Sequence, residues 1–344
     1  MTITPRELVH QTLAFAHPPR APRDLWVLPV ASEQFTDEIA ELEREFPSDF
    51  ISISGHESSI APTRGEPYAA GEYSDAWGCT FVNIQHGVIG EVKVPLVNDW
   101  TTDCSRIHLP REWLTIDRDA VNRDCAATDR FTLCGACPRP FEQLQFIRGS
   151  EEFYMDLADP PPAMLAFMQE IHAFYCEVLQ TWARTEVDAL SIMDDWGSQR
   201  SLLISPKLWR ELFKPMYRDY AQIARSHGKK LFMHSDGHIA AIYPDLIEIG
   251  IDAVNSQLFC MGPDTLAAHA GKITFWGEID RQHLLPHATT TEIAQAVSSV
   301  HEHLWRAGGC IAQCEFGPAA RPENVHEVFA AWDDLTTRKP VSGP

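Results

Sequence analysis

The sequence predicts an α/β protein, a single (β/α)8 barrel, and three observations lead to that prediction. Short apolar runs recur through the second half of the chain, separated by amphipathic segments of helical length. Four runs end in polar residues able to do chemistry: ALSIM precedes Asp194, KLFM precedes His234, ITFW precedes Gly277 and Glu278, and GCIAQ precedes Cys314. The 344 residues, 44% of them hydrophobic, suffice for one barrel of roughly 250 residues plus insertions. We therefore expect parallel strands whose carboxyl ends share one face, where α/β barrels place their active sites.

The first 130 residues are predicted to form an N-terminal extension and an insertion. A helix is expected over 5–15, and the run LWVLPV after a Pro-rich turn is interpreted as a lead-in to the barrel. A charged helix over 36–45 precedes the expected first strand at 50–54. Residues 56–129 are rich in Gly, Pro, Trp and Thr, and 74–100 alternates like a small antiparallel hairpin. We expect this insertion, after the first strand, to cover the barrel mouth within one domain spanning 1–344.

Beyond residue 130 the alternation of strands and helices is regular. Strands are expected over 189–193, 230–233, 253–255, 273–276 and 310–313. Helices are expected over 162–184, 206–227, 239–249, 263–270, 291–307 and 322–336. Ser205 before Pro206 and Thr291 before Glu292 are the expected N-caps of two of these helices. The tail at 339–344 is expected to be disordered.

Charge and composition exclude several classes of function. A formal net charge of -20 argues against a nucleic-acid partner, which requires a concentrated basic surface. No stretch approaches the roughly 20 apolar residues of a membrane span, and the N-terminus lacks the features of a secretory signal, so a cytoplasmic protein is expected. Nine cysteines without a small-domain framework fit reduced thiols better than disulfides.

The polar residues at the predicted strand ends indicate a metal site. His234 and Asp236 in FMHSDGH stand two residues apart, so both side chains fall on one side of an extended strand. Cys314 would supply a thiolate, and adjacent Asp194 and Asp195 could divide into one ligand and one acid or base. Zinc accepts this mixture of nitrogen, sulfur and oxygen. The alternatives are a structural histidine, a buried core thiol and an aspartate cap.

Other motifs carry less information. The C-x-x-C formed by Cys134 and Cys137 lacks a second ligand pair for a structural zinc, and the motif could instead line the pocket near the end of its strand. No phosphate-binding or dinucleotide-binding glycine motif follows a strand, so nucleotide binding lacks support.

Several stretches together resemble the uroporphyrinogen decarboxylase superfamily, over nearly the whole length of the chain. These are TPRELV, YSDAWGC, FEQLQFIRGSEEF, LLISPKLWRELFKPMY, HGKKLFMHSDGHI, LIEIGIDAVNSQ, ITFWGEIDRQHLLP and RPENVHEVF. The resemblance implies a (β/α)8 barrel and one of two chemistries: metal-free decarboxylation of a tetrapyrrole, or zinc-dependent methyl transfer involving a corrinoid or a thiol. The decarboxylase branch uses N-terminal arginines to hold its polycarboxylate substrate, whereas LWVLPVASEQF contains none, so this branch is disfavoured.

The methyltransferase branch resembles the chain better. Its zinc-ligand pattern carries over onto His234, Cys314 and Asp194, with Asp236 standing where the family has a second cysteine. Replacing sulfur with oxygen makes the bound metal a stronger Lewis acid and less suited to activating a thiol.

The expected function is a zinc-dependent methyltransferase or demethylase acting on a small molecule, with a corrinoid on a partner protein as a further expected component. The residues expected to do chemistry are Asp194, Asp195 and Asp236. The residues expected to contact substrate are Tyr73, Trp77, Trp196, Gln257 and Glu278. A lyase or decarboxylase acting on a small carboxylate is the alternative, with Arg139 and Arg200 as anion clamps; a binding barrel without catalysis is disfavoured because titratable groups are dense on one face. The methyl donor, the acceptor and the oligomeric state are not determined by the sequence.

Overall fold

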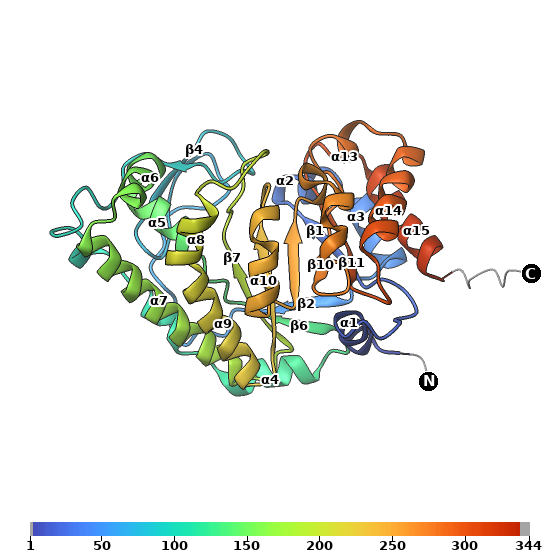
Figure 1. The fold of residues 1–344 in the computed structure, drawn as a ribbon, viewed down its shortest axis with the longest axis horizontal. Helices are drawn as coiled ribbons and strands as arrows, with labels where there is room; N and C mark the ends of the chain where they lie inside the picture. Colours follow the sequence, from blue (N-terminus) through green and yellow to red (C-terminus); the bar gives the residue numbers. More distant parts are fainter. Residues whose placement is uncertain (1–2, 338–344) are drawn as a thin grey trace, which may run out of the picture.

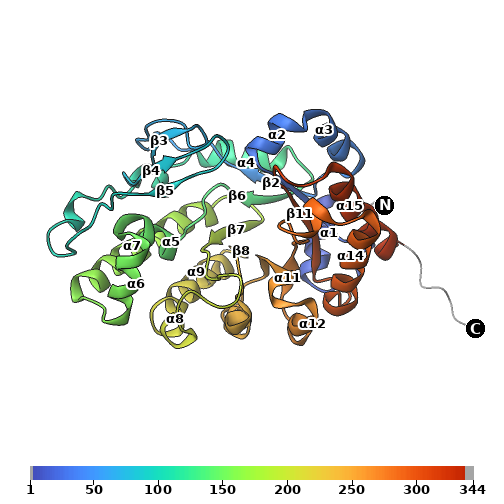
Figure 2. The ribbon, with the colours of Figure 1, turned by 90° about the horizontal axis from the view of Figure 1, so that it is seen from above.

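The computed structural model describes residues 3–337, and its centre is an eight-stranded parallel barrel (Figures 1 and 2). The order around the sheet is β1-β11-β10-β9-β8-β7-β6-β2, and the neighbouring strands in this order pair in parallel. The strands are β1 (Arg23–Val27), β2 (Phe50–Ile53), β6 (Phe131–Cys134), β7 (Ala189–Met193), β8 (Lys230–Ser235), β9 (Ala253–Ser256), β10 (Thr274–Trp276) and β11 (Cys310–Phe316). Between β1 and β2, the carboxylate of Asp49 accepts the N–H of Arg23 at 2.7 Å and nearly closes the barrel. The predicted (β/α)8 barrel is confirmed.

Helices surround the strands, as the view from above shows (Figure 2). The longer ones are α1 (Pro5–Leu13), α3 (Thr36–Glu45), α4 (Arg118–Ala126), α5 (Pro140–Arg148), α6 (Ser150–Ala158), α7 (Pro162–Ala183), α9 (Lys214–Ser226), α14 (Thr290–Leu304) and α15 (Pro322–Thr337). The shorter ones are α2 (Pro29–Gln34), α8 (Pro206–Leu212), α10 (Tyr243–Ile249), α11 (Leu258–Met261), α12 (Pro263–Leu266) and α13 (Leu284–His287), with single 3-10 turns at Cys104–Arg106, Arg111–Leu114, Ala240–Ile242 and Ala267–His269. None of the helices in the described part of the chain is long and apolar enough to cross a membrane.

The interior of the barrel is filled mainly by large rings. Phe50, Phe131, Phe232, Trp276 and Ile311 form one buried cluster with the small residues between them. Side chains alternate along each strand, so the residues two positions after those of the interior cluster also point into the barrel and lie nearer the carboxyl ends of the strands. This alternation decides which polar residues enter the candidate site.

The N-terminal helix α1 packs against the amino ends of the strands. Val9 and Leu13 belong to the interior cluster, and Arg6 pairs with Asp188 at 3.0 Å. Thr4 and Glu7 form a capping box that fixes the start of the helix. The predicted N-terminal extension therefore covers the amino-terminal end of the barrel, which is opposite the candidate site.

Residues 71–92 form a separate antiparallel sheet of β3 (Gly71–Ser74), β4 (Thr80–Asn83) and β5 (Glu91–Val92), to one side of the barrel (Figure 2). The hairpin predicted from the alternation is confirmed. The segment follows β2, which is the second strand of the barrel in chain order and not the predicted first strand. The first strand is β1, which comes from the run interpreted as a lead-in, and its Leu25 pairs with Cys314 of β11.

Two helix predictions need correction. The helix expected over 206–227 is two helices that meet at Phe213, because Pro215 has no N–H to bond the preceding turn. The cap of α14 is Thr289, which forms a capping box with Glu292, in place of Thr291. Ser205 caps α8 as predicted, accepting the N–H of Leu208 at 3.2 Å. The predicted disordered tail, 339–344, lies outside the described residues.

Candidate metal centre

Three side chains at the carboxyl ends of β7 and β8 converge on one point. Asp195, His234 and Asp236 each offer one ligand atom, and these atoms all lie within 4.8 Å of one another. His234 Nε2 is 3.6 Å from Asp195 Oδ1 and 3.8 Å from Asp236 Oδ1. Phe232 faces the barrel interior, so the alternation along β8 brings the next two residues of that face, His234 and Asp236, to the barrel mouth. The grouping of His234 with Asp236 is as the sequence predicts.

The hydrogen bonds around His234 assign its tautomer. Asn255 Nδ2 donates to the carbonyl of Trp276 at 2.6 Å, which turns Asn255 Oδ1 toward His234 Nδ1, also at 2.6 Å. Since Oδ1 only accepts, Nδ1 carries a proton, and Nε2 is the ring nitrogen that faces the two aspartates and can offer a lone pair to a metal ion. A second partner that fixes the far ring nitrogen is the usual arrangement around a metal-ligating histidine.

The aspartates leave lone pairs for the same point. Asp195 Oδ1 accepts the N–H of Asp236 at 2.9 Å. Asp236 Oδ2 accepts from Arg281, whereas its Oδ1 is buried and has no hydrogen-bond partner among the described residues. An unpartnered carboxylate oxygen beside an imidazole lone pair fits a divalent cation, and one nitrogen with two oxygens suits zinc, manganese or ferrous iron.

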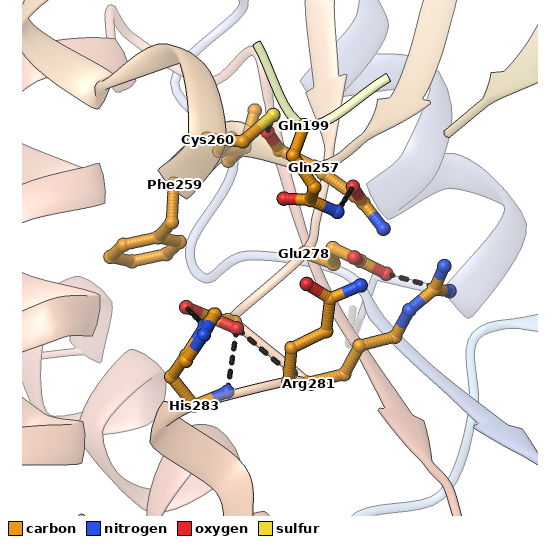
Figure 3. A pocket seen from close by; sticks show the side chains of 10 residues that line it. Gln199, Gln257, Phe259, Cys260, Glu278, Arg281 and His283 are labelled. Carbon is orange, nitrogen blue, oxygen red and sulfur yellow. Dashed lines mark hydrogen bonds and ion pairs between the residues drawn. The ribbon is translucent and has the colours of Figure 1, made fainter. Parts of the chain in front are cut away.

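Arg281 holds the acids next to this group. Its guanidinium bonds Asp236, lies 2.8 Å from Glu315 Oε2 and 3.5 Å from Glu278 Oε2. Burial raises the pKa of Glu278 to about 8, against the opposite pull of Arg281. Glu278 therefore carries a proton near neutral pH, within a cavity of about 170 Å³ that Gln257 and His283 also line (Figure 3).

A second acid able to hold a proton lies within electrostatic reach of Asp195 and Asp236. Glu142, at the start of α5, is half-buried, but its Oε2 is buried and has no hydrogen-bond partner in the described part of the chain. Burial and the charge of Asp195 raise its pKa to about 7. The candidate centre is thus flanked by two carboxyls that can hold a proton at pH 7.

Asp194 is placed apart from its neighbour. Its carboxylate accepts the N–H groups of Phe141 at 3.1 Å and Glu142 at 2.8 Å, and the hydroxyl of Tyr217 at 2.5 Å. Burial raises the pKa of Asp194 well above its usual range. Asp194 thereby ties the first turn of α5 and helix α9 to the end of β7, and it is not in the three-residue group.

Cys314 is likewise not in the group. β11 continues to Phe316, and Cys314 lies with Ala312 and Phe316 in the core between the barrel and its helices, whereas Ile311 faces the interior. Burial raises the pKa of its thiol well above the usual range. The next residue, Glu315, reaches the site through Arg281, so the structure brings an acid where the sequence predicts a sulfur.

The residues predicted to contact substrate are distributed over three places. Gln257 and Glu278 line the small cavity at the centre. Tyr73 and Trp77 line a larger cavity of about 720 Å³ under the β3-β4-β5 sheet. Trp196 is fully buried, stacks on Phe141 at 4.0 Å between ring centroids and donates to Tyr217, so it belongs to the core.

The sequence arguments did not single out Arg281, Asn255, Glu142 or Glu315. Arg281 was detectable in principle, because it stands three residues after Glu278 in GEIDR. Of the C-x-x-C pair, Cys137 lines the larger cavity, and all nine cysteines are free thiols. Both agree with the expectations from sequence.

Comparison with known proteins places the chain in a family. The family described as uroporphyrinogen decarboxylase matches residues 74–335. Among solved structures, a methyltransferase from Methanosarcina mazei is similar with a TM-score of 0.67 and 11% identity, over 97% of this chain and 99% of that one.

Two other barrels give weaker similarity. A xylanase from Gloeophyllum trabeum has a TM-score of 0.37 at 11% identity, covering 62% of this chain and 79% of that one. A D-psicose 3-epimerase has a TM-score of 0.39 at 12% identity, covering 64% and 83%. The comparison with curated proteins finds no match. Because the family match covers well over half of the sequence, the chain belongs to the uroporphyrinogen decarboxylase family.

Proposed function

We propose that the protein is a metal-dependent methyltransferase that removes a methyl group from oxygen or nitrogen of a small molecule and passes it to a corrinoid. The observation that carries the proposal is the meeting of an imidazole lone pair with an unpartnered, buried oxygen of Asp236 at the barrel mouth. The similarity of the fold to a methyltransferase supports the choice of chemistry. Asp195, His234 and Asp236 would hold the ion, zinc being the first candidate.

The donor set favours activation of the methyl donor. One nitrogen and two oxygens leave a bound ion with more Lewis acidity than a thiolate-rich site would, so it would polarise the heteroatom that carries the methyl group. Asn255 orients His234, and Arg281 orients Asp236. Arg281 also lowers the charge that the three acids around it would otherwise present to substrate.

The buried acids supply the proton. When the carbon–oxygen or carbon–nitrogen bond breaks, the leaving heteroatom takes the bonding electrons and needs a proton. Glu278, with its pKa raised to about 8, and Glu142, at about 7, hold one at physiological pH. Glu278 lines the cavity beside the metal group and is our choice for the donor.

A direct test uses free cob(I)alamin as the acceptor and a panel of methyl ethers and methylamines as donors. Formation of methylcobalamin by the zinc-loaded protein, followed by its absorbance, is expected for at least one donor. His234→Ala should abolish it, and Glu278→Gln should lower kcat by about 100-fold or more. Asp280→Asn, which changes another acid of the same cavity, is the matched control. Equal rates in His234→Ala and wild type would contradict the proposal.

A second candidate is a lyase or decarboxylase acting on a small carboxylate. Arg139, which lines the larger cavity, and the two protonated acids favour it, because such a reaction needs an anion contact and a proton donor. Turnover of a carboxylate without any corrinoid would distinguish this candidate from methyl transfer.

A further inference from the structure

The larger cavity has the size and lining of a binding site for a small organic molecule. Its volume is about 720 Å³, within the range of about 300–1,000 Å³ of small-molecule sites. It lies where the segment 56–129 meets helices α5 and α7, and both sides contribute aromatic rings. Six of these rings belong to Tyr73, Trp77, Phe81, Trp113, Phe146 and Trp182. Rings on several sides favour a flat, apolar ligand.

One cation interrupts this apolar lining. Arg139 precedes α5 and lines the cavity. No carboxylate of residues 3–337 lies within 4.0 Å of its guanidinium, and it donates no hydrogen bond to any of these residues, whereas Arg281 contacts three acids. Burial acts against the charge of Arg139, and the nearby carboxyl of Glu142, which lies beyond 4.0 Å, acts in the opposite direction. A half-buried guanidinium that makes no direct ion pair or hydrogen bond is costly, and an anion offers it paired, bidentate hydrogen bonds.

The acids that line the same cavity either accept hydrogen bonds from other groups or lie at its edge. Asp75 Oδ1 accepts the N–H groups of Trp77 at 3.0 Å and Cys79 at 2.7 Å, so its charge holds its own turn together. Glu57 is only half-buried and pairs through its backbone with Ile116. Neither carboxylate lies within 4.0 Å of the guanidinium of Arg139.

A hydrogen-bond donor is also available. Trp77 is almost fully buried, and its indole N–H has no acceptor among the described residues. A buried indole N–H is normally satisfied, so an oxygen of a bound molecule would supply what the protein does not.

The cavity is connected to the metal centre through the start of α5. Asp194 holds the N–H groups of Phe141 and Glu142, and these residues follow Arg139 by two and three positions. Asp195, a member of the metal group, is next to Asp194 in the chain. The charges of Arg139, Asp195 and Asp236 all act on the carboxyl of Glu142, so a molecule anchored at Arg139 lies near the metal centre.

We propose that this cavity binds a planar aromatic molecule carrying one anionic group, a carboxylate in the simplest case, with Arg139 as the anion contact. The role of that molecule as substrate rests on the proposed function, but its binding does not. A molecule with two aromatic rings fits the volume of the cavity, and its anionic group would face Arg139 and the metal centre.

The test is isothermal titration of the purified full-length protein with 2-naphthoate and with its neutral counterpart 2-naphthamide. Naphthoate is expected to bind wild type about ten- to a hundredfold more tightly than naphthamide, which is the usual contribution of hydrogen bonds to a charged group. Arg139→Gln should remove this preference and leave naphthamide binding unchanged. Arg118→Gln, at an exposed arginine outside the cavity, is the matched control and should retain the preference.

Several outcomes would overturn the inference. The first is equal affinity of wild type for the two probes, and the second is a preference for naphthoate that survives in Arg139→Gln. The third is the absence of naphthoate binding at about 1 mM, a concentration on the order of the weakest specific dissociation constants. The comparison of the two probes needs only wild type, so a variant that does not fold leaves the test intact. Neither probe carries a methyl group, so their binding is measured independently of methyl transfer. Naphthoate binding together with failure of every donor in the cob(I)alamin assay would support the cavity and contradict the proposed function, and the reverse pair of results would do the opposite.

Discussion

Replacing Arg281 with glutamine is expected to destabilise the metal-free protein substantially. The guanidinium bonds Asp236, Glu278 and Glu315, and its side chain is 18% exposed while that of Glu278 is 2% exposed. Removing one partner of a buried ion pair costs about 3–5 kcal/mol. We expect about 3 kcal/mol, the lower end, because Asp236 is partly exposed and Glu278 already carries a proton near neutral pH.

The expected change in melting temperature follows from the size of the chain. Unfolding entropy is about 2.1 cal/mol/K per residue, so 344 residues give about 0.7 kcal/mol/K. A loss of about 3 kcal/mol then lowers Tm by about 4 °C. Zinc should raise Tm more in Arg281→Gln than in wild type, since the ion replaces the missing positive charge among the acids.

Differential scanning calorimetry with and without a chelator measures both effects. Arg44→Gln is the control, because Arg44 and Glu41 are both exposed and their contact at 3.5 Å should contribute less than about 0.5 kcal/mol. The reasoning about the acid cluster fails if the metal-free Arg281→Gln protein melts within 1 °C, roughly the error of such scans, of Arg44→Gln.

Three further predictions concern positions around the centre. Asp24→Asn should stabilise the protein at pH 7 by about 3 kcal/mol but have little effect near pH 4. Burial raises the pKa of Asp24 from 3.8 to about 6, although hydrogen bonds from Trp276 and Trp26 act to lower it. The contribution of Asp24 to stability is therefore present below about pH 4 and is lost as the pH rises through 6. Urea unfolding at both pH values checks this, and an equal effect at the two would contradict it. Cys314→Ala should cost about 1–2 kcal/mol through a small cavity while metal content stays that of wild type; loss of the metal would return the thiol to the ligand set. Trp196→Ala should cost about 3–5 kcal/mol in the same unfolding assay, because its ring stacks on Phe141 and bonds Tyr217; a loss below 1 kcal/mol, about the level of a surface change, would contradict its place in the core.

The barrel was predictable because its signal is local and repeated. Each apolar run from residue 189 onward is followed by an amphipathic helix, and one such unit specifies a strand with its crossover. β1 was not predicted as a strand of the barrel, because the features that identify it are not local. Its pairing partner β11 lies almost 300 residues away in the chain, and Pro29, two residues after the end of β1, suggests a loop when the sequence is read alone.

The metal group was predictable in part for a similar reason. His234 lies in β8 and Asp236 directly follows the end of that strand, so their spacing of two gives both side chains a common direction. The direction of Cys314 depends on where β11 ends, and the strand runs three residues past Gln313. The pleat then turns Cys314 outward and Glu315 toward Arg281, a result that the local sequence does not specify.

The contacts of Arg281 and Asn255 depend on the closure of the barrel. Arg281 bonds Asp236, which is 45 residues earlier in the chain, and Asn255 reaches the carbonyl of Trp276 on the next strand. Such partners are set by strand order and register, whereas composition and periodicity give only the strands themselves.

Metal content measured by mass spectrometry after dialysis against zinc tests the central claim most directly. The account predicts one zinc per chain in wild type and in Asp280→Asn, and its loss in His234→Ala and Asp236→Asn, whose ligand atoms lie together with that of Asp195. Full zinc retention in both His234→Ala and Asp236→Asn, with the protein folded, would contradict it.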